Sequence, residues 1–449
     1  YSVVPAPRTI FKGIRALPPG HALVWENGRL AVEPYWRLRF TPKRAIAEAE
    51  AREEIRRLRL EATRLRLISD VPLGAFLSGG IDSSAVVACM ARTSAARVRT
   101  FSIGFDAAAF DELRYARQVA AAFDTDHHET VVRPYAMAIL PDLVWAYDQP
   151  YGDSSAIPSF YVARMARQHV TVALNGDGGD EAFGGYERYM AQALAARYQA
   201  VPRPLRTGAE ALARAALRPF AGPRTLARKA LRFLEAAARP PAERYLAWVL
   251  TFDATARRAL YTPEFGARIG GERPERLVEQ RLSDRGDPLD ALFASDYALY
   301  LPDDLLVKMD VATMTHSLEA RSPFLDHELV EFAATLPAAW KVRGLSTKWL
   351  LRRALRGWLP KAILRRGKMG FGVPLSRWFR GELRGFAEDV LGPDGLGKRG
   401  YFRPDAVARL LAEHGAGHAD HAHRLWALLV FELWHRTFLD PPAPAKITL

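Results

Sequence analysis

Residues 76–91, FLSGGIDSSAVVACMA, interrupt an apolar sequence with two glycines, an aspartate and two serines. The preceding VPLGAFL predicts a buried strand, and the following SAVVACMA predicts a helix with one apolar face. A connection this short can be a tight turn with an N-cap. It can also be a phosphate cradle, in which backbone N–H groups and the positive end of the helix face an anion. The rest of the chain has to distinguish the two.

Strands and helices alternate after this turn, which predicts an α/β fold with a parallel sheet and helices on both faces. The expected strands are VPLGAFL, VRTFSIGF, HHETVV and VTVALN, with helices after Ser83 and over ELRYARQVAAAF. A charged helix is expected over residues 42–68. From about Tyr186 the chain reads as mostly helical, and the tail DPPAPAKITL reads as disordered.

The first 38 residues differ from the rest. An Asn27-Gly28 dipeptide separates HALVW from RLAVEPYW, and Asn-Gly between apolar runs is the strongest short-range hairpin signal. Two strands cannot hold a core alone. We therefore interpret residues 1–38 as the tail of a β-rich domain whose beginning is not in this chain.

A second glycine-rich stretch, TVALNGDGGDEAFGGYERY at residues 171–189, repeats the arrangement of strand, turn and helix. Two such loops at the carboxyl ends of parallel strands predict a ligand site. Asp177, Asp180 and Glu181 repel one another unless a cation or a cationic substrate lies among them, although acids also serve as turn formers and N-caps. The first loop lacks the lysine of a Walker loop. Mg²⁺ would therefore neutralise the phosphates, with Asp82 and Asp180 as its natural ligands.

Charge, hydropathy and cysteine content narrow the function further. The net charge of +13 suits a nucleic-acid partner, but arginine is interleaved with Ala and Leu, without a polybasic block, which favours solvated helix faces. No apolar run approaches the ~20 residues that span a bilayer, so no membrane partner is expected. Cys89, the single cysteine, rules out an internal disulfide and a CxxC site, and its apolar neighbours predict a buried thiol.

Four further motifs carry a resemblance to a known family. NGDGGDEAFGGY, LEARSPFLDHELVEFAATLP, STKWLLRRALRGWLP and KMGFGVPLSRWFRGELR resemble glutamine-hydrolysing asparagine synthetases, and SGGIDSS resembles the pyrophosphate loop of adenylate-forming ATP pyrophosphatases. GIRALPPGHALVWENGRLAVEPYW resembles the end of that family's glutaminase domain. The resemblance implies an N-terminal-nucleophile glutaminase remnant at residues 1–38. It implies at residues 39–449 a parallel-sheet ATP pyrophosphatase (adenine nucleotide α-hydrolase-like) domain with a large helical C-terminal part.

The resemblance implies a cytoplasmic ligase that uses ATP, Mg²⁺, aspartate and ammonia from glutamine. The aspartate β-carboxylate forms β-aspartyl-AMP, and ammonia then displaces AMP. The implied ATP-binding residues are Leu77, Ser78, Gly79, Gly80, Asp82, Ser83, Ser84, Ile103, Asn175 and Gly176. The implied catalytic residues are Lys348, Asp177 and Asp180. Asp177 contacts the amino-acid substrate or the attacking amine, at a position where relatives carry a longer glutamate.

The lysines have a physical argument beside the resemblance. Ser346 reads as an N-cap, which places Lys348 in a first helical turn, where a cation opposes the helix dipole unless it faces phosphates. Lys308 and Arg321 are candidates for binding substrate carboxylates, but Arg321 is equally a candidate ion-pair partner of Asp326 or Glu319. Lys368 lies in a glycine-flanked loop that either closes over phosphates or is simply solvated.

Two other classes of function remain open from the sequence. An RNA-modifying ATP pyrophosphatase would suit the positive charge, but it commonly needs reactive cysteines or an RNA-binding appendage, so no nucleic acid is expected. A non-catalytic scaffold is disfavoured by the intact Asp82, Asp180 and Lys348. Among ligases, a sugar acid or a peptide carboxylate is an alternative acceptor to aspartate. A homodimer is compatible with the sequence but is not predicted by it.

Overall fold

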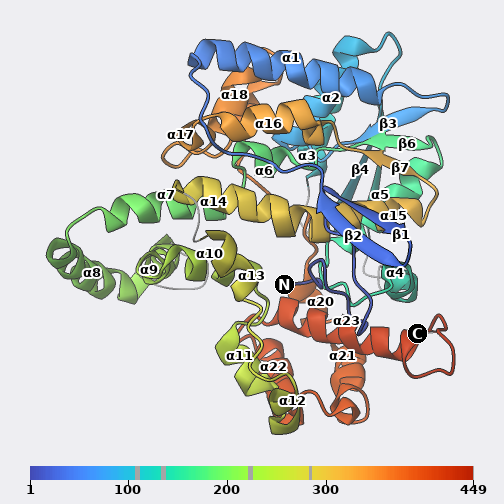
Figure 1. Ribbon diagram of the computed structural model, residues 1–449, viewed down its shortest axis with the longest axis vertical. Coiled ribbons are helices and arrows are strands. Elements are labelled where there is room, and N and C mark those ends of the chain that lie inside the picture. Colours follow the sequence, from blue (N-terminus) through green and yellow to red (C-terminus); the bar gives the residue numbers. More distant parts are fainter. Residues whose placement is uncertain (107–111, 133–137, 221–225, 283–285, 448–449) are drawn as a thin grey trace.

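The computed structural model of the protein describes residues 1–106, 112–132, 138–220, 226–282 and 286–447 (Figure 1). Five parallel strands form the central sheet in the order β5-β4-β3-β6-β7. They are β3 (Leu73–Phe76), β4 (Arg99–Phe105), β5 (Asp126–Val132), β6 (Val172–Leu174) and β7 (Glu319–Arg321). The four predicted strands and their parallel arrangement are confirmed. The additional strand β7 has only three residues, too few to show an alternating pattern.

Alternation along the strands divides the core between the two faces of the sheet. Ala75, Leu77 and Leu174 pack on one side, whereas Phe76 and Phe101 pack on the other. The first face is covered by α1 (Glu48–Arg66), α2 (Ile81–Thr93), α3 (Leu113–Ala122), α16 (His327–Thr335), α18 (Trp349–Ala354) and α19 (Lys361–Arg365). The second face packs against α5 (Ala156–Arg167) and α15 (Val307–Met314). The apolar cluster on that side continues outward through α4 (Leu140–Tyr147), α20 (Leu375–Arg380), α21 (Arg384–Leu391), α22 (Pro404–Gly415) and α23 (Ala422–Phe438). The predicted helices on both faces are therefore present.

A helical extension lies beside the sheet (Figure 1). It contains α7 (Glu187–Gln199), α8 (Arg203–Leu217), α9 (Leu226–Ala237), α10 (Pro241–Val249), α13 (Arg276–Leu282), α14 (Pro288–Ser295) and the π-helical segment η4 (Asp296–Leu306). Residues of α7, α10, α13, α14 and η4 contribute to a separate apolar cluster. The helices α11 (Ala254–Leu260) and α12 (Pro263–Arg268) lie apart, beside α22 (Figure 1), and Leu260 of α11 belongs to the apolar cluster of the second face. The fully buried Asp296 accepts hydrogen bonds from Arg188, Tyr189 and Tyr245, which ties α7 and α10 to η4. Short helices complete the fold: α6 (Gly179–Phe183), α17 (Ala338–Lys341), η3 (Arg218–Phe220), η5 (Pro323–Leu325) and η6 (Leu396–Arg399).

The predicted hairpin is confirmed. Strands β1 (His21–Glu26) and β2 (Arg29–Pro34) pair antiparallel around Asn27 and Gly28, whose φ values are 48° and 74°. Nearly all of the side chains of the two strands are exposed. The hairpin therefore has no core of its own, as expected for a pair of strands.

One boundary prediction was wrong. Helix α1 begins at Glu48 rather than at residue 42, because Lys43 donates to the carbonyl oxygens of Ala334 and Leu336 and this holds the preceding segment outside the helix. The C-terminal tail, interpreted from the sequence as disordered, has no helix or strand over its described residues 440–447, but two ion pairs attach it to the rest of the chain. Asp440 pairs with Arg399, and Lys446 pairs with Asp142.

The predicted burial of Cys89 is confirmed, because the thiol is fully enclosed in α2. Burial also raises the pKa of this thiol. Within the described ranges, no helix combines the length and the apolar character that crossing a membrane requires.

Candidate active site

The loop after β3 ends at the amino terminus of the thirteen-residue helix α2. The backbone N–H of Ser78 donates to Ser83 Oγ at 3.2 Å, and the N–H of Gly80 donates to Ser78 Oγ at 3.3 Å. The two serine hydroxyl oxygens lie 3.1 Å apart. The helix begins earlier than predicted, at Ile81, so Asp82 lies in its first turn. The positive end of the α2 dipole therefore opens toward this loop.

Two of the loop residues face away from the cavity. Gly79 has φ +69°, and a Cβ there would lie 2.5 Å from the backbone nitrogen of Ala116 at the start of α3. Glycine is required at this position by conformation and by close packing. Ser84 is fully buried and, like Gly79, does not line the cavity. These two residues, which were predicted to bind ATP, therefore support the loop on the side away from the cavity.

The second glycine-rich loop follows β6 and touches the first. A Cβ on Gly176 would lie 2.9 Å from the Cβ of Asp82. Asn175 fixes the loop, because its Oδ1 accepts from Ser322 Oγ at 2.6 Å and from the N–H of Asp177 at 3.2 Å. The buried Nδ2 of Asn175 has no hydrogen-bond partner within the described ranges. Both loops therefore open onto one space at the carboxyl edge of the sheet.

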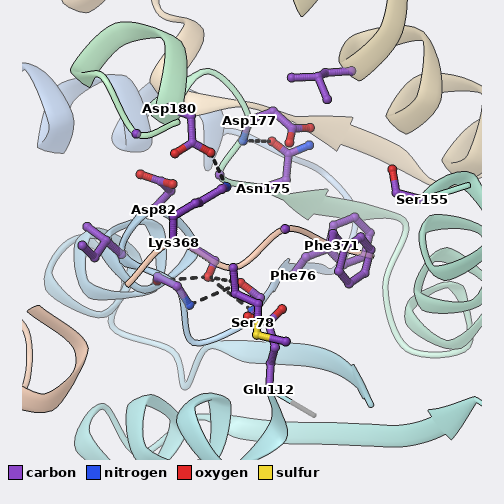
Figure 2. A pocket seen from close by; sticks show the side chains of 18 of the residues that line it. Phe76, Ser78, Asp82, Glu112, Ser155, Asn175, Asp177, Asp180, Lys368 and Phe371 are labelled. Atoms are coloured by element: carbon purple, nitrogen blue, oxygen red, sulfur yellow. Dashed lines mark hydrogen bonds and ion pairs between the residues drawn. The ribbon is translucent and has the colours of Figure 1, made fainter. Parts of the chain in front are cut away.

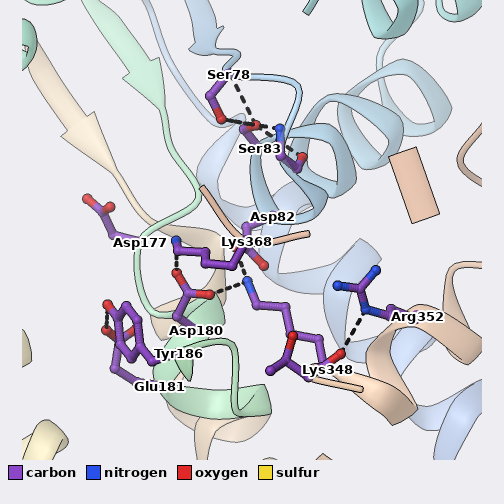
Figure 3. A network of polar contacts seen from close by, with 12 residues as sticks. Ser78, Asp82, Ser83, Asp177, Asp180, Glu181, Tyr186, Lys348, Arg352 and Lys368 are labelled. Atoms are coloured by element: carbon purple, nitrogen blue, oxygen red, sulfur yellow. Dashed lines mark hydrogen bonds and ion pairs between the residues drawn. The ribbon is translucent and has the colours of Figure 1, made fainter. Parts of the chain in front are cut away.

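Two carboxylates and two lysines meet between the loops (Figure 3). The Nζ of Lys348 lies 2.6 Å from Asp180 Oδ1 and also contacts Asp82 Oδ2, while Lys368 contacts Asp180 Oδ2. The side chain of Lys348 is only 4% exposed, so this contact is shielded from water. Burial alone would raise the pKa of Asp180, but the two lysines outweigh it and hold that pKa well below its usual range.

Lys348 reaches this position through an unexpected backbone conformation. It occupies the N-cap of α18 with φ 53° and ψ 34°, in the left-handed region. Ser346 was predicted to be the N-cap, but its backbone instead pairs with that of Arg343 at 2.9 and 3.0 Å. The N–H of Lys348 donates to the carbonyl oxygen of Gly184 at 3.2 Å. The lysine thus precedes the helix and is tied directly to the second loop.

Two further acids of the second loop have raised pKa values. Burial, only partly offset by Lys308 and Lys368, raises the pKa of Asp177 to about 6. Burial and the neighbouring Asp180 raise the pKa of Glu181 to about 7. Among the described residues, Asp177 Oδ2 has no hydrogen-bond partner, whereas Glu181 Oε1 accepts from the Tyr186 hydroxyl at 2.5 Å. Asp177 is therefore the acid that remains available to a ligand.

Lys308 lies at another wall of the same space, on α15. Its Nζ lies 2.8 Å from Ser155 Oγ and 3.1 Å from Asp153 Oδ2. Ser155 also donates to Asp153 Oδ2 at 2.6 Å. Sequence reasoning missed Asp153 and Ser155, although Asp-Ser-Ser before a helix is a recognisable capping pattern.

Arg321 does not reach the cavity. Its Nε lies 2.6 Å from Glu319 Oε1, and its Nη1 donates to the carbonyl oxygens of Arg66 and Ile68. Asp326, the other proposed partner, pairs instead with Arg66 at 2.9 Å. Of the two roles considered for Arg321, the structure favours the ion pair over substrate binding.

The cavity enclosed by these elements has a volume of about 390 Å³ (Figure 2). The predicted residues that line it are Leu77, Ser78, Gly80, Asp82, Ser83, Ile103, Asn175, Gly176, Asp177, Asp180, Lys308, Lys348 and Lys368. Phe76, Phe101 and Phe371 add apolar surface that the sequence did not point to. The long glycine-rich motifs predicted the polar residues of the cavity. The three aromatic residues were not predicted, because in the sequence they are indistinguishable from residues of the hydrophobic core.

A metal would have to be held by very few protein groups. Among the residues that the structure describes, no cluster of three or more His, Cys, Asp or Glu side chains could hold one. Asp82 and Asp180 nevertheless approach the same point, and Asp82 Oδ1 is buried with no hydrogen-bond partner in the part of the chain that the structure describes. Two carboxylates fit a hard cation whose remaining ligands are phosphate oxygens and water.

Known proteins share this arrangement of motifs along nearly the whole chain. The sequence model of the family described as Asparagine synthase matches residues 54–436. Asparagine synthetase (glutamine-hydrolyzing) 1 of Bacillus subtilis strain 168 is 32% identical over 440 residues, covering 97% of this chain and 67% of that protein. A putative asparagine synthetase (glutamine-hydrolyzing) of Mycobacterium tuberculosis H37Rv is 35% identical over 454 residues, covering 99% and 67%. Amidase chyE of Penicillium rubens is 27% identical and covers 84% and 61%.

Proposed function

Because the chain belongs to the asparagine synthase family of ATP-dependent carbon–nitrogen ligases, we propose that it converts aspartate into asparagine. One observation carries the proposal. Two glycine-rich loops at the carboxyl ends of β3 and β6 bring Asp82 and Asp180 together with Lys348 and Lys368 in a single cavity. Such a cavity suits a substrate with a charged triphosphate.

In the first step, a β-carboxylate oxygen of aspartate attacks the α-phosphorus of ATP. The bond from that phosphorus to the oxygen bridging the β-phosphorus breaks, so β-aspartyl-AMP forms and pyrophosphate leaves. The hydroxyls of Ser78 and Ser83, which line the cavity, and the positive end of α2 would bind the pyrophosphate portion. Leu77 and Ile103 line the cavity and would flank the adenosine.

Negative charge on the phosphoryl oxygens increases as the bond to pyrophosphate breaks. Lys348 and Lys368 place compact ammonium groups beside this region, where little water dilutes their field. Asp82 and Asp180 would hold Mg²⁺, which when bound neutralises phosphate charge. Of the two lysines, Lys348 is the more buried, at 4% against 31% for the side chain of Lys368.

In the second step, ammonia attacks the carbonyl carbon of the β-aspartyl group. The bond between that carbon and the AMP oxygen breaks, AMP leaves, and the nitrogen loses a proton to give the amide. Asp177 is the acid available to hold the aspartate ammonium or the attacking amine. Lys308, held by Asp153 and Ser155, would bind a substrate carboxylate.

The test is ATP–pyrophosphate exchange by the purified protein with a panel of carboxylic acids. Exchange that requires aspartate, followed by asparagine formation on addition of ammonium, is the expected result. If a sugar acid or a peptide supports exchange and aspartate does not, the protein is still an ATP-dependent ligase but its acceptor is not aspartate. Absence of exchange with every acid would contradict the proposal.

We further propose that residues 1–38 belong to a glutaminase domain and that glutamine is its nitrogen source. The relatives named above as glutamine-hydrolysing span further than this chain, which covers 67% of each. The hairpin leaves Leu23, Val24, Trp25 and Leu30 between 48% and 66% exposed, as suits strands of a larger β-rich domain. Hydrolysis of glutamine by a longer form of the protein, and its loss when the hairpin residues become polar, would support this assignment.

A further inference from the structure

The two carboxylates assigned to the metal are already bridged by a cation of the protein itself. The Nζ of Lys348 contacts Asp82 Oδ2 and lies 2.6 Å from Asp180 Oδ1. We propose that Lys348 is a built-in competitor of the divalent cation, so that the site admits the metal together with the triphosphate and excludes the metal alone. This inference rests on the proposed function, because it takes Asp82 and Asp180 as the metal ligands.

The backbone packs closely against one side of this bridge. A Cβ on Gly185 would lie 1.8 Å from Asp180 Oδ1 and 2.3 Å from Lys348 Cε. A Cβ on Gly179 would lie 2.5 Å from Asp82 Oδ1. The carboxylates and the lysine stem are therefore held from that side, and they line the cavity on the other. Because the ammonium of Lys348 contacts Asp82 Oδ2 and lies 2.6 Å from Asp180 Oδ1, a metal ion that bridges these two oxygens has to take its place.

Charge decides when that displacement is favourable. Two carboxylates are balanced here by two ammonium groups, since Lys368 holds the other oxygen of Asp180. A bare dication taking over the carboxylates would leave both ammonium groups without a partner, next to a new double charge and largely shielded from water. The free energy of that arrangement is unfavourable, so metal binding without a nucleotide should be weak.

The triphosphate supplies the missing partner. Its oxygens accept from the displaced lysines, and the flexible four-carbon stem of Lys348 lets the ammonium turn from carboxylate to phosphate. Conversely, the nucleotide without metal would place its phosphates against two unneutralised carboxylates. Each ligand therefore favours the other, and thermodynamic linkage requires the two enhancements to be equal.

The experiment measures Mn²⁺ binding to the protein of residues 1–449 by the electron paramagnetic resonance signal of free Mn²⁺, with and without α,β-methylene-ATP, after subtracting the Mn²⁺ that the analogue binds in the absence of protein. For the wild type, we expect the analogue to tighten Mn²⁺ binding by at least about tenfold, within the usual range of coupling between sites. Lys348→Met should bind Mn²⁺ alone at least about tenfold more tightly than the wild type, with much of the coupling lost. Adding Asp180→Asn to that variant should abolish the gain, which locates it at this site.

Lys398→Met is the matched control, because Lys398 is an exposed lysine paired with the exposed Asp394, outside the cavity lining. It should bind Mn²⁺ as the wild type does. Equal Mn²⁺ affinity of the wild type with and without the analogue would overturn the inference, and so would a folded Lys348→Met protein that binds Mn²⁺ no more tightly. If circular dichroism shows that Lys348→Met does not fold, the same measurement is made with Lys348→Gln, which removes the charge and keeps a polar side chain.

The inference and the proposed function fail in different ways. If Mn²⁺ and nucleotide bind cooperatively but exchange does not depend on aspartate, Lys348 still competes with the metal and aspartate is not the acceptor. If exchange with aspartate is normal but Mn²⁺ and nucleotide bind independently, the protein is still the proposed ligase and Lys348 does not compete with the metal.

Discussion

The guanidinium of Arg366 donates a hydrogen bond of 3.1 Å to the carbonyl oxygen of Ser78. The same guanidinium contacts Glu112 and lies 4.1 Å from the ring centroid of Tyr115. Lys368, two residues further on, reaches Asp180 in the other loop. One short segment after α19 therefore links both glycine-rich loops, and its anchor on the phosphate loop is Arg366.

Replacing this anchor by a shorter cation should loosen the phosphate loop. Lysine keeps the charge of Arg366, but it lacks the planar fork that contacts Ser78 and Glu112 together. We expect Arg366→Lys to lower the ATP–pyrophosphate exchange rate by about tenfold or more, in line with the effect of misplacing a positioned group. The circular dichroism spectrum should not change, and full exchange activity in this variant would contradict the role of the anchor.

The assignment of Asp82 and Asp180 as metal ligands predicts a larger loss of exchange activity. Asp82→Asn and Asp180→Asn should each reduce exchange by at least the ~10²–10³-fold typical of losing one electrostatic stabiliser. Each variant also leaves Lys348 with only one carboxylate, so the midpoint of thermal unfolding should be measured in parallel. A folded variant of either kind with near-normal exchange would remove that residue from the metal site.

The sequence predicted those parts of the site that depend on local pattern. Strand, turn and helix followed from the apolar runs around Ser78 and Asn175, and the hairpin followed from Asn27-Gly28. The conformation of Lys348 did not follow, because its φ of 53° is imposed by the contact with Gly184 and by two carboxylates from distant segments. Arg321 stayed ambiguous because both Glu319 and Asp326 lie within five residues of it, and only the folded chain assigns Asp326 to Arg66.

Glycine at position 185 is predicted to be essential for a steric reason. A Cβ there would lie 1.8 Å from Asp180 Oδ1 and 2.3 Å from Lys348 Cε, so one of the two charged groups must move. We expect Gly185→Ala to abolish most of the exchange activity by displacing them, by about 10²-fold, as for a misplacement of about 1 Å. Gly266→Ala in α12 is the control, since the added methyl group would meet no described residue outside its own helix. Equal activity of the two variants would show that the packing at Gly185 is not needed.

Asp177 should reduce stability at neutral pH. Its pKa of about 6 lies above the ordinary value of 3.8, so the folded protein binds this proton more tightly than the unfolded chain does. The contribution of this group to the free energy of unfolding is therefore largest below about pH 4, and it is lost as the pH rises through about 6. An asparagine side chain cannot ionise, so Asp177→Asn should unfold at higher urea concentration than the wild type at about pH 7.5, by up to about 3 kcal/mol.

The difference in unfolding free energy between Asp177→Asn and the wild type should shrink markedly at about pH 4.5, where the wild-type carboxyl is protonated in the folded protein. Asp389→Asn is a suitable control because this aspartate is exposed on α21. A gain for Asp177→Asn of the same size at both pH values would mean that ionisation of Asp177 is not its cause. The same variant should lose aspartate-dependent exchange if the carboxylate holds the substrate, which would make it more stable and less active.

The last prediction concerns the nitrogen that the protein of residues 1–449 can use. Releasing ammonia from glutamine through a thiol requires an accessible thiolate and donors for the oxyanion. The printed sequence has one cysteine, Cys89, and that thiol is fully buried in α2 with a raised pKa. Ammonia, by contrast, needs only access to the cavity. We therefore expect asparagine from ATP, Mg²⁺, aspartate and ammonium, and none above background when glutamine replaces ammonium.

The measurement compares asparagine and glutamate formed by this protein with each nitrogen source, in buffer freed of ammonium. Cys89→Ser separates the two explanations for any activity with glutamine, because a buried structural thiol should be dispensable for both reactions. If glutamate appears at the rate of asparagine formation and Cys89→Ser abolishes it, the buried thiol must become accessible and act as the nucleophile. If glutamate appears and Cys89→Ser does not change it, residues 1–449 contain a glutaminase that uses no thiol. Either result would contradict the assignment of glutamine hydrolysis to a domain of which residues 1–38 form only the end.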